Sequence, residues 1–286
     1  MISSSWAEKF GLKRNPFQDS LDTDLFFRTR QHEEALLKMK IGIEESHALI
    51  LLSGKSGTGK TLVSQLVLQG LNQDRFLPSF VFVYPGMGKG PLLEAVLAES
   101  GVDGIARSTN RRLTQLQDEA LARHSQGERL VVIVEEAHFL KADGLHLLRT
   151  LSNLETEMEK LVTVVLVAED SLVKRLKRPS YNSLRGRITF SMSLKPLSPE
   201  ETEQFVKFRL LKCGGDAGLL GRGSYDLVYR LTGGLPREIN KLLYNSLLEA
   251  LVDDKKELTP AVLEKTGKKI GVSDGQNGQT AFATTL

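Results

Sequence analysis

One stretch constrains the fold of this chain more than any other: Gly54-Lys55-Ser56-Gly57-Thr58-Gly59-Lys60-Thr61. It fits the phosphate-loop pattern G-x-x-x-x-G-K-[ST] at every fixed position. An apolar run of strand length, residues 48–52, precedes the motif, and apolar residues follow it at helical spacing, beginning with Leu62. This strand-loop-helix context favours a real phosphate-binding loop over a chance match in a glycine-rich turn.

Each part of this loop has an expected role. The glycines let backbone N–H groups turn inward around the phosphates, and the new helix begins with its positive dipole end facing the anion. Lys60 is expected to reach the β- and γ-phosphates, and Thr61 to place its hydroxyl on Mg²⁺. We therefore expect ATP with Mg²⁺ to bind along residues 54–61 and Leu62.

Charge and cysteine content exclude several classes of protein. The 38 basic and 35 acidic residues leave a net charge of +3, which is too small to indicate nucleic-acid binding by itself. The single cysteine, Cys213, rules out an internal disulfide, and the five histidines show no zinc-site spacing. No apolar run approaches the ~20 residues that a membrane span needs, and the N-terminus shows no signal-peptide pattern. A cytoplasmic protein without a structural metal is expected.

The middle of the chain alternates between strand and helix patterns. Further strand-like segments are expected at residues 79–84, 130–135, 161–168 and 188–193, after a helix from about 31 to 45. Several are apolar without alternation, which is typical of parallel strands buried on both faces. Residues 31–195 are therefore predicted to form an α/β nucleotide-binding domain.

The pattern becomes helical after residue 195. Ser198 and Glu201 form a capping box around Pro199, a favoured first helical residue. Helices are expected over residues 199–211, 224–231, 236–251 and 260–268. Residues 196–270 are predicted to be a small all-helical domain, and residues 271–286 a disordered tail because they contain few large apolar residues. Residues 1–30 show no clear periodicity and are expected to act as a linker.

A second candidate site element comes directly after the apolar run at residues 130–134. It finishes in Glu135-Glu136, at the edge of the sheet where open α/β folds bind ligands. In a Walker B element, Glu135 would hold Mg²⁺ and Glu136 would orient or deprotonate the attacking water. Two solvated carboxylates at a strand end are the alternative, which the upstream phosphate loop disfavours.

Three arginines are candidates for contact with a γ-phosphate. Arg185 and Arg187 come just before the last strand-like segment, and Arg237 begins a predicted helix after Gly234-Leu-Pro. A guanidinium near the γ-phosphate stabilises transition-state charge. Taken alone, each arginine fits a surface residue better than a site residue, and only the spacing from the Walker elements favours a functional role.

Over roughly residues 8–268 the chain resembles the AAA+ ATPases, and within them the ExeA/GspA family of secretion and pilus-assembly ATPases. Phe10-Gly11-Leu12 and Asn15-Pro16-Phe17 resemble the family's opening signature, and Leu194-x-Pro-Leu-Ser its entry to a helical lid. The resemblance implies a five-stranded parallel sheet, a lid domain, assembly with copies of itself that can close a ring, and a secretion or type IV pilus membrane complex as partner. The protein would then lie at the inner face of the membrane through that partner.

The resemblance also assigns roles to individual residues. It implies that Asn15, Pro16 and Phe17 lie near the adenine. It further implies that Arg185 and Arg187 supply an arginine finger to a neighbouring subunit, and that Arg237 is a sensor 2 arginine acting on its own subunit's nucleotide.

Two positions depart from the family pattern. Glu135 stands where the family has Asp, and Glu169 stands where the family has a sensor 1 Gln. The longer acid is harder to fix on the metal, and a second negative charge is unfavourable near an anionic transition state. Slow ATP hydrolysis is expected.

Two other functions fit the same motifs. A DNA-associated AAA+ regulator of the transposition-helper type has a similar core, and Arg111-Arg112, Lys174-Arg175 and Lys177-Arg178 are the densest basic clusters. Aromatic residues for base stacking are not interleaved with them, which makes nucleic acid the weaker partner. A structural switch that binds ATP and seldom hydrolyses it is the third alternative.

Overall fold

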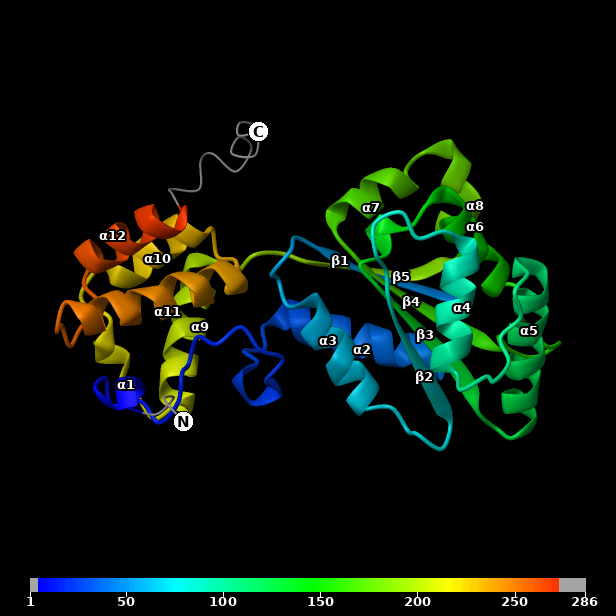
Figure 1. Cartoon of the computed structure of the whole chain (residues 1–286), viewed down its shortest axis with the longest axis horizontal. Helices are drawn as coiled ribbons and strands as arrows, with labels where there is room; N and C mark the ends of the chain where they lie inside the picture. The colour runs from blue at the N-terminus through cyan, green and yellow to red at the C-terminus, as the bar shows by residue number, and fades with distance from the viewer. Residues whose placement is uncertain (1–4, 273–286) are drawn as a thin grey trace. The chain divides into compact units, whose positions relative to one another are not determined.

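The structure is a computed structural model, and it describes residues 5–272 (Figure 1). Within these residues the chain forms two compact units: Arg30–Leu194, and a second unit that joins residues 5–29 to residues 195–272. No helix among residues 5–272 is long and apolar enough to cross a membrane. The predicted tail falls outside the described residues from position 273 onward.

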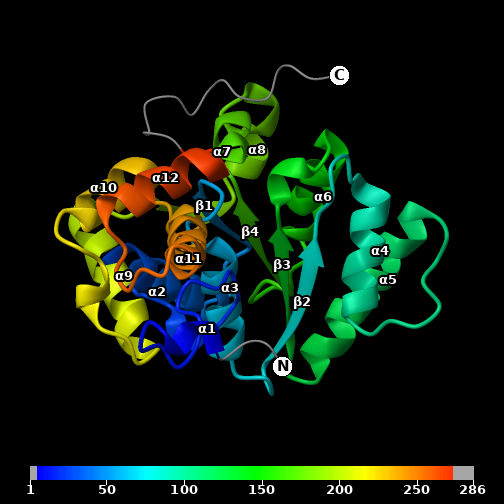
Figure 2. The same cartoon turned by 60° about the vertical axis from the view of Figure 1, so that its left-hand side comes forward.

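The α/β unit is built on one parallel sheet of five strands in the order β2-β3-β4-β1-β5. The strands are β1 (Leu49–Gly54), β2 (Phe76–Phe82), β3 (Arg129–Glu135), β4 (Val162–Ala168) and β5 (Ile188–Leu194). Figure 2 shows β2, β3 and β4 running side by side in one direction. The three central strands are buried along their whole length, which explains their unbroken apolar runs. The predicted α/β fold with a five-stranded parallel sheet is confirmed.

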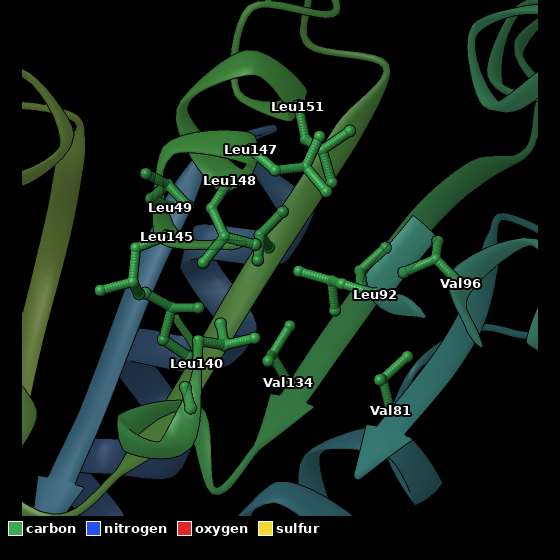
Figure 3. Packing of buried hydrophobic residues seen from close by; sticks show 14 of the residues in the cluster. Leu49, Val81, Leu92, Val96, Val134, Leu140, Leu145, Leu147, Leu148 and Leu151 are labelled. Atoms are coloured by element: carbon green, nitrogen blue, oxygen red, sulfur yellow. The ribbon is translucent and has the colours of Figure 1, made fainter. Parts of the chain in front are cut away.

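Helices cover both faces of this sheet. The helices are α2 (Arg30–Glu44), α3 (Lys60–Gln69), α4 (Lys89–Glu99), α5 (Thr109–Ser125), α6 (Ala142–Leu151), α7 (Asp170–Leu176) and α8 (Asn182–Arg185), with short 3-10 turns η2 (Ala137–Phe139) and η3 (Pro179–Tyr181). Leu92 of α4 and Leu148 of α6 pack into one core with Leu49 of β1 and Val134 of β3 (Figure 3). On the opposite face, α2 approaches so closely that a Cβ at Gly42 would meet the side chain of Ile50.

The second unit is helical. Its elements are α1 (Ser5–Glu8), η1 (Thr23–Leu25), α9 (Pro199–Lys212), η4 (Ala217–Leu219), α10 (Ser224–Thr232), α11 (Pro236–Val252) and α12 (Pro260–Ile270). The capping box is formed as expected: Ser198 Oγ accepts from the Glu201 backbone N–H, and Glu201 Oε2 accepts from that of Ser198 at 2.9 Å. The four long helices lie within two residues of their predicted ends.

The N-terminal segment is part of the helical unit rather than a free connection. Its side chains Phe10, Leu12 and Phe17 are buried in the same core as α9 and α11. The Lys13 backbone N–H donates to the carbonyl of Cys213 at 2.7 Å. The residues expected to form a linker thus supply part of this unit's core, and the boundary after Leu194 lies one residue from the predicted one.

Candidate functional site

The phosphate loop joins β1 to α3 in a backbone conformation that requires glycine. Gly54 has φ +154° and Gly59 has φ +95°, values that residues with side chains rarely adopt. A Cβ at Gly54 would lie 2.5 Å from the carbonyl oxygen of Leu194. Helix α3 begins at Lys60, so its first backbone N–H groups line the loop. The strand-loop-helix arrangement therefore has the geometry of an anion site.

Lys60 is held inside this loop. Its ammonium Nζ donates to the carbonyl oxygens of Gly54 and Lys55, each at 3.0 Å, and the residue is only 6% exposed. A buried ammonium among loop carbonyls provides a fixed positive charge beside the N-terminus of α3. The residues predicted to surround the phosphates, 54–61 with Leu62, are thus brought to one place by the fold.

Glu135, at the end of β3, faces two hydroxyl groups of α3. Ser64 Oγ donates to Glu135 Oε1 at 2.6 Å, and Thr61 Oγ1 lies 3.4 Å from Oε2. Glu135 is fully buried, and this burial raises its pKa above the usual carboxyl range, an effect that the Ser64 hydrogen bond opposes. An oxygen-only set of a carboxylate and a hydroxyl beside a phosphate loop fits Mg²⁺, a hard cation.

Ser64 was not among the predicted site residues. It lies three positions after Thr61 on α3, and residues three apart occupy the same face of a helix. That spacing, combined with the expected direction of Glu135, is the signal that could have identified it.

Glu136 and Glu169 meet around His138. Glu136 follows β3 in a left-handed conformation (φ +57°), and Glu169 follows the neighbouring strand β4. His138 Nε2 lies 3.5 Å from Glu136 Oε2 and 4.0 Å from Glu169 Oε2. The two predicted acids are therefore neighbours, and the Glu169 carboxylate faces an imidazole.

Arg185 and Arg187 do not approach the phosphate loop of their own chain. Ile188, which follows them, pairs with Leu49 at the start of β1, whereas the loop follows the other end of β1. The six residues of β1 span five rises of ~3.3 Å, so its two ends lie about 16 Å apart. Arg185 is exposed, and its guanidinium forms no hydrogen bond or ion pair within residues 5–272.

In the helical unit, the residues that were predicted to lie near the adenine are close to Arg237. A cavity of about 860 Å³ is lined by Asn15, Phe17 and Arg237 among others. Asn15 Oδ1 accepts from the Phe17 backbone N–H at 2.9 Å, and the carbonyl of Pro16 accepts from Arg209 Nη1 at 2.8 Å. The N-terminal segment is thereby fixed against α9 and brought beside the first turn of α11.

Comparison with known proteins agrees with this geometry. Residues 43–176 match the model of the AAA domain family. The chain is 30% identical over 283 residues to General secretion pathway protein A of Aeromonas hydrophila, in an alignment covering 98% of this chain and 51% of that protein. The chain thus spans about half the length of this relative.

Solved structures show the same fold at low sequence identity. The Aeropyrum pernix ORC2 protein has a TM-score of 0.65 at 16% identity, covering 90% of this chain and 71% of its own. Drosophila ORC, solved bound to DNA, has a TM-score of 0.68 at 16% identity, covering 94% of this chain and 65% of its own. The α/β unit thus carries a match to the AAA domain family over residues 43–176, and over nearly its whole length the chain is similar to General secretion pathway protein A.

Proposed function

We propose that this protein binds Mg-ATP, hydrolyses it slowly and works as a homo-oligomer. One observation carries the proposal: buried Lys60 lies in the phosphate loop while the hydroxyls of Thr61 and Ser64 face the buried carboxylate of Glu135. These groups match the two halves of a Mg-nucleotide site, a cation for phosphates and oxygen ligands for a metal.

The residues divide the chemistry among them. Lys60 and the N–H groups at the start of α3 bind and orient the phosphates, and Thr61 with Glu135 would hold Mg²⁺. When bound, Mg²⁺ neutralises phosphate charge. Glu136 orients the attacking water and accepts its proton. Slow turnover follows because Glu135 has one more torsion to fix than an aspartate, and misplacement by about 1 Å can cost ~100-fold in rate.

The position of the arginine finger candidates supports the proposed oligomer. Arg185 and Arg187 lie at the opposite end of the sheet from their own phosphate loop. These arginines could therefore contact a γ-phosphate only if the nucleotide is bound to a second copy of the chain. Arg237 would act on the nucleotide of its own chain, as the resemblance to AAA+ proteins implies.

The cellular role is proposed from the relative alone. Similarity to General secretion pathway protein A supports a role in assembling a secretion or type IV pilus apparatus, at the cytoplasmic face of the inner membrane through a partner. Neighbouring genes for pilins or secretins would support this role, and a neighbouring transposase or recombinase gene would contradict it.

Two basic side chains count against the DNA-associated alternative. Arg112 pairs with Glu94 at 2.8 Å and donates to the carbonyl of Ala106. Arg175 donates to the carbonyl of Leu140 at 2.6 Å and to the Tyr181 hydroxyl. Because these two guanidiniums are engaged within the fold, fewer of their N–H donors can contact a phosphate backbone than the sequence suggests.

Calorimetric titration of Lys60→Ala with Mg-ATP tests the proposal. Losing a charge-assisted contact worth about 1.5–3 kcal/mol should weaken ATP binding about 10- to 150-fold. Lys55→Ala is the matched control. The Lys55 side chain is exposed, and only its backbone carbonyl bonds to Lys60, so the substitution keeps that bond. Equal affinity of Lys60→Ala and wild type would refute the nucleotide site.

A further inference from the structure

His138 is a partly shielded side chain between two acids of the proposed site. It lies in η2, directly after β3, with its side chain 10% exposed. Its ring packs on that of Phe139, with centroids 4.1 Å apart. Nε2 points between the carboxylates of Glu136 and Glu169, and one ligand atom from each of the three residues lies within 4.8 Å of the others. Packing fixes the ring, so the direction of its nitrogens has consequences for both acids.

The backbone of Glu169 determines which ring nitrogen carries the proton. The Glu169 N–H points at His138 Nδ1 at 3.3 Å. A backbone N–H can only donate, so Nδ1 must accept and therefore carries no proton. In the neutral ring the proton is then on Nε2, the atom that faces the two carboxylates.

This tautomer argues against a metal ion in the cluster. A metal bound to Nε2 requires the lone pair of that nitrogen and a proton on Nδ1. A proton on Nδ1 would face the Glu169 N–H, donor against donor. The arrangement fits an N–H that faces two acids, with Nε2 3.5 Å from Glu136 Oε2 and 4.0 Å from Glu169 Oε2.

We propose that His138 is a positioning residue for ATP hydrolysis: its Nε2–H holds the Glu136 carboxylate and offsets the charge of Glu169. The inference rests on the proposed ATPase function, in which Glu136 orients the attacking water. Strands β3 and β4 are neighbours, so the two acids that follow them are forced together. Without the donor, two like charges face each other across the gap and Glu136 loses its fixed orientation. His138 therefore acts through Glu136 and need not touch the nucleotide.

Two substitutions of His138 distinguish the effect of its Nε2–H donor from the effect of its ring packing. His138→Phe keeps a planar ring but removes the donor, and should lower kcat at least ~10-fold because the water-orienting group is misplaced. His138→Gln carries an amide N–H at a similar reach and should keep kcat within about threefold of wild type, since hydrogen-bond donation is retained. Mg-ATP affinity, measured by calorimetry, should change less than about twofold in both variants because neither touches the phosphate loop.

His146→Phe is the matched control, since His146 is exposed on α6 and stacks on Tyr181. Its kcat should equal that of wild type. If His138→Phe turns over like wild type, or His138→Gln is as slow as His138→Phe, the inference is wrong. If wild type hydrolyses ATP no faster than Lys60→Ala, the proposed function fails and the inference fails with it.

Nitrogen-15 NMR of histidine-labelled protein tests the tautomer without any activity measurement. The signals of His138 are identified by their absence from the His138→Gln spectrum. The Nε2–H form is expected in metal-free wild type, and the Nδ1–H form would overturn the inference. Addition of Zn²⁺ should leave the His138 signals in place, whereas stoichiometric loss of the Nε2 proton would reveal a metal site instead.

Discussion

Replacing Glu135 with Gln should stabilise the metal-free α/β unit while it removes the proposed metal ligand. Glu135 is fully buried, and in place of water it has one short bond from Ser64 and a long contact with Thr61. A hydrogen bond to a charged group contributes about 1.5–3 kcal/mol, whereas burial of an ionised carboxylate costs several kcal/mol. The raised pKa of Glu135 shows that burial outweighs the bonds. A neutral amide of the same size should therefore raise the free energy of unfolding by about 1–3 kcal/mol at pH 8.

The increase in the free energy of unfolding caused by Glu135→Gln should grow as the pH rises. Because burial raises the folded-state pKa of Glu135 above its unfolded value, the folded chain binds more protons than the unfolded chain between the two values. The contribution of Glu135 to stability is fully present below the unfolded pKa of about 4.5 and is lost as the pH rises through the folded pKa. The advantage of Glu135→Gln should thus be near zero close to pH 4.5 and grow toward pH 8.

Urea unfolding in EDTA, followed by far-UV circular dichroism, measures this difference. The only tryptophan, Trp6, lies in the helical unit, so its fluorescence reports the unfolding of that unit. The remaining unfolding transition seen by circular dichroism is then assigned to the α/β unit. Glu136→Gln, partly exposed and one residue along, is the matched control and should shift stability by less than about 0.5 kcal/mol. A destabilised Glu135→Gln at pH 8, or a gain independent of pH, would refute the reasoning.

Three further results are expected. Mixing Lys60→Ala chains with chains carrying Arg185→Ala and Arg187→Ala should restore some ATP turnover, and a mixture as inactive as its components argues against a shared site. Glu135→Asp combined with Glu169→Gln should raise kcat with little change in ATP affinity, whereas Glu136→Gln should abolish turnover in the same steady-state assay. Phe17→Ala, which empties a fully buried position, should cost about 3–5 kcal/mol in the Trp6 unfolding transition; unchanged stability would mean that the N-terminal segment is not part of the core.

Local pattern sufficed for most of the elements. The largely apolar runs of β3 and β4 predict buried parallel strands because every side chain there is enclosed. The Ser198–Glu201 box marks the start of α9 through bonds between neighbours in the chain. Strand β2 begins three residues before its predicted start, since an edge strand tolerates the proline at position 78.

Features that depend on tertiary contacts could not be predicted from the sequence. Phe10, Leu12 and Phe17 lie in irregular backbone, so no periodicity indicates that all three are buried together. The meeting of Glu136 with Glu169 depends on β3 and β4 being neighbours, which the order of strands along the chain does not specify. His138 follows Glu136 by two residues, and its tautomer is set by a backbone N–H 31 residues away.

The discontinuous helical unit sets an order of events during protein synthesis. The hydrogen bond from Arg209 to the carbonyl of Pro16 joins residues 193 positions apart. A ribosome adding about 5–20 residues per second needs about 10–40 s to cover that distance. The last strand of the α/β unit, β5, is complete only when residue 194 has been added. Late in this interval the α/β unit, which lies wholly between the two halves, therefore has all of its strands and can fold, while Phe10, Leu12 and Phe17 still lack α9 and α11. Phe10, Leu12 and Phe17 thus leave the ribosome before the α/β unit but are buried only after that unit can fold, and a slow codon between Leu194 and Arg209 prolongs their exposure to chaperones and proteases.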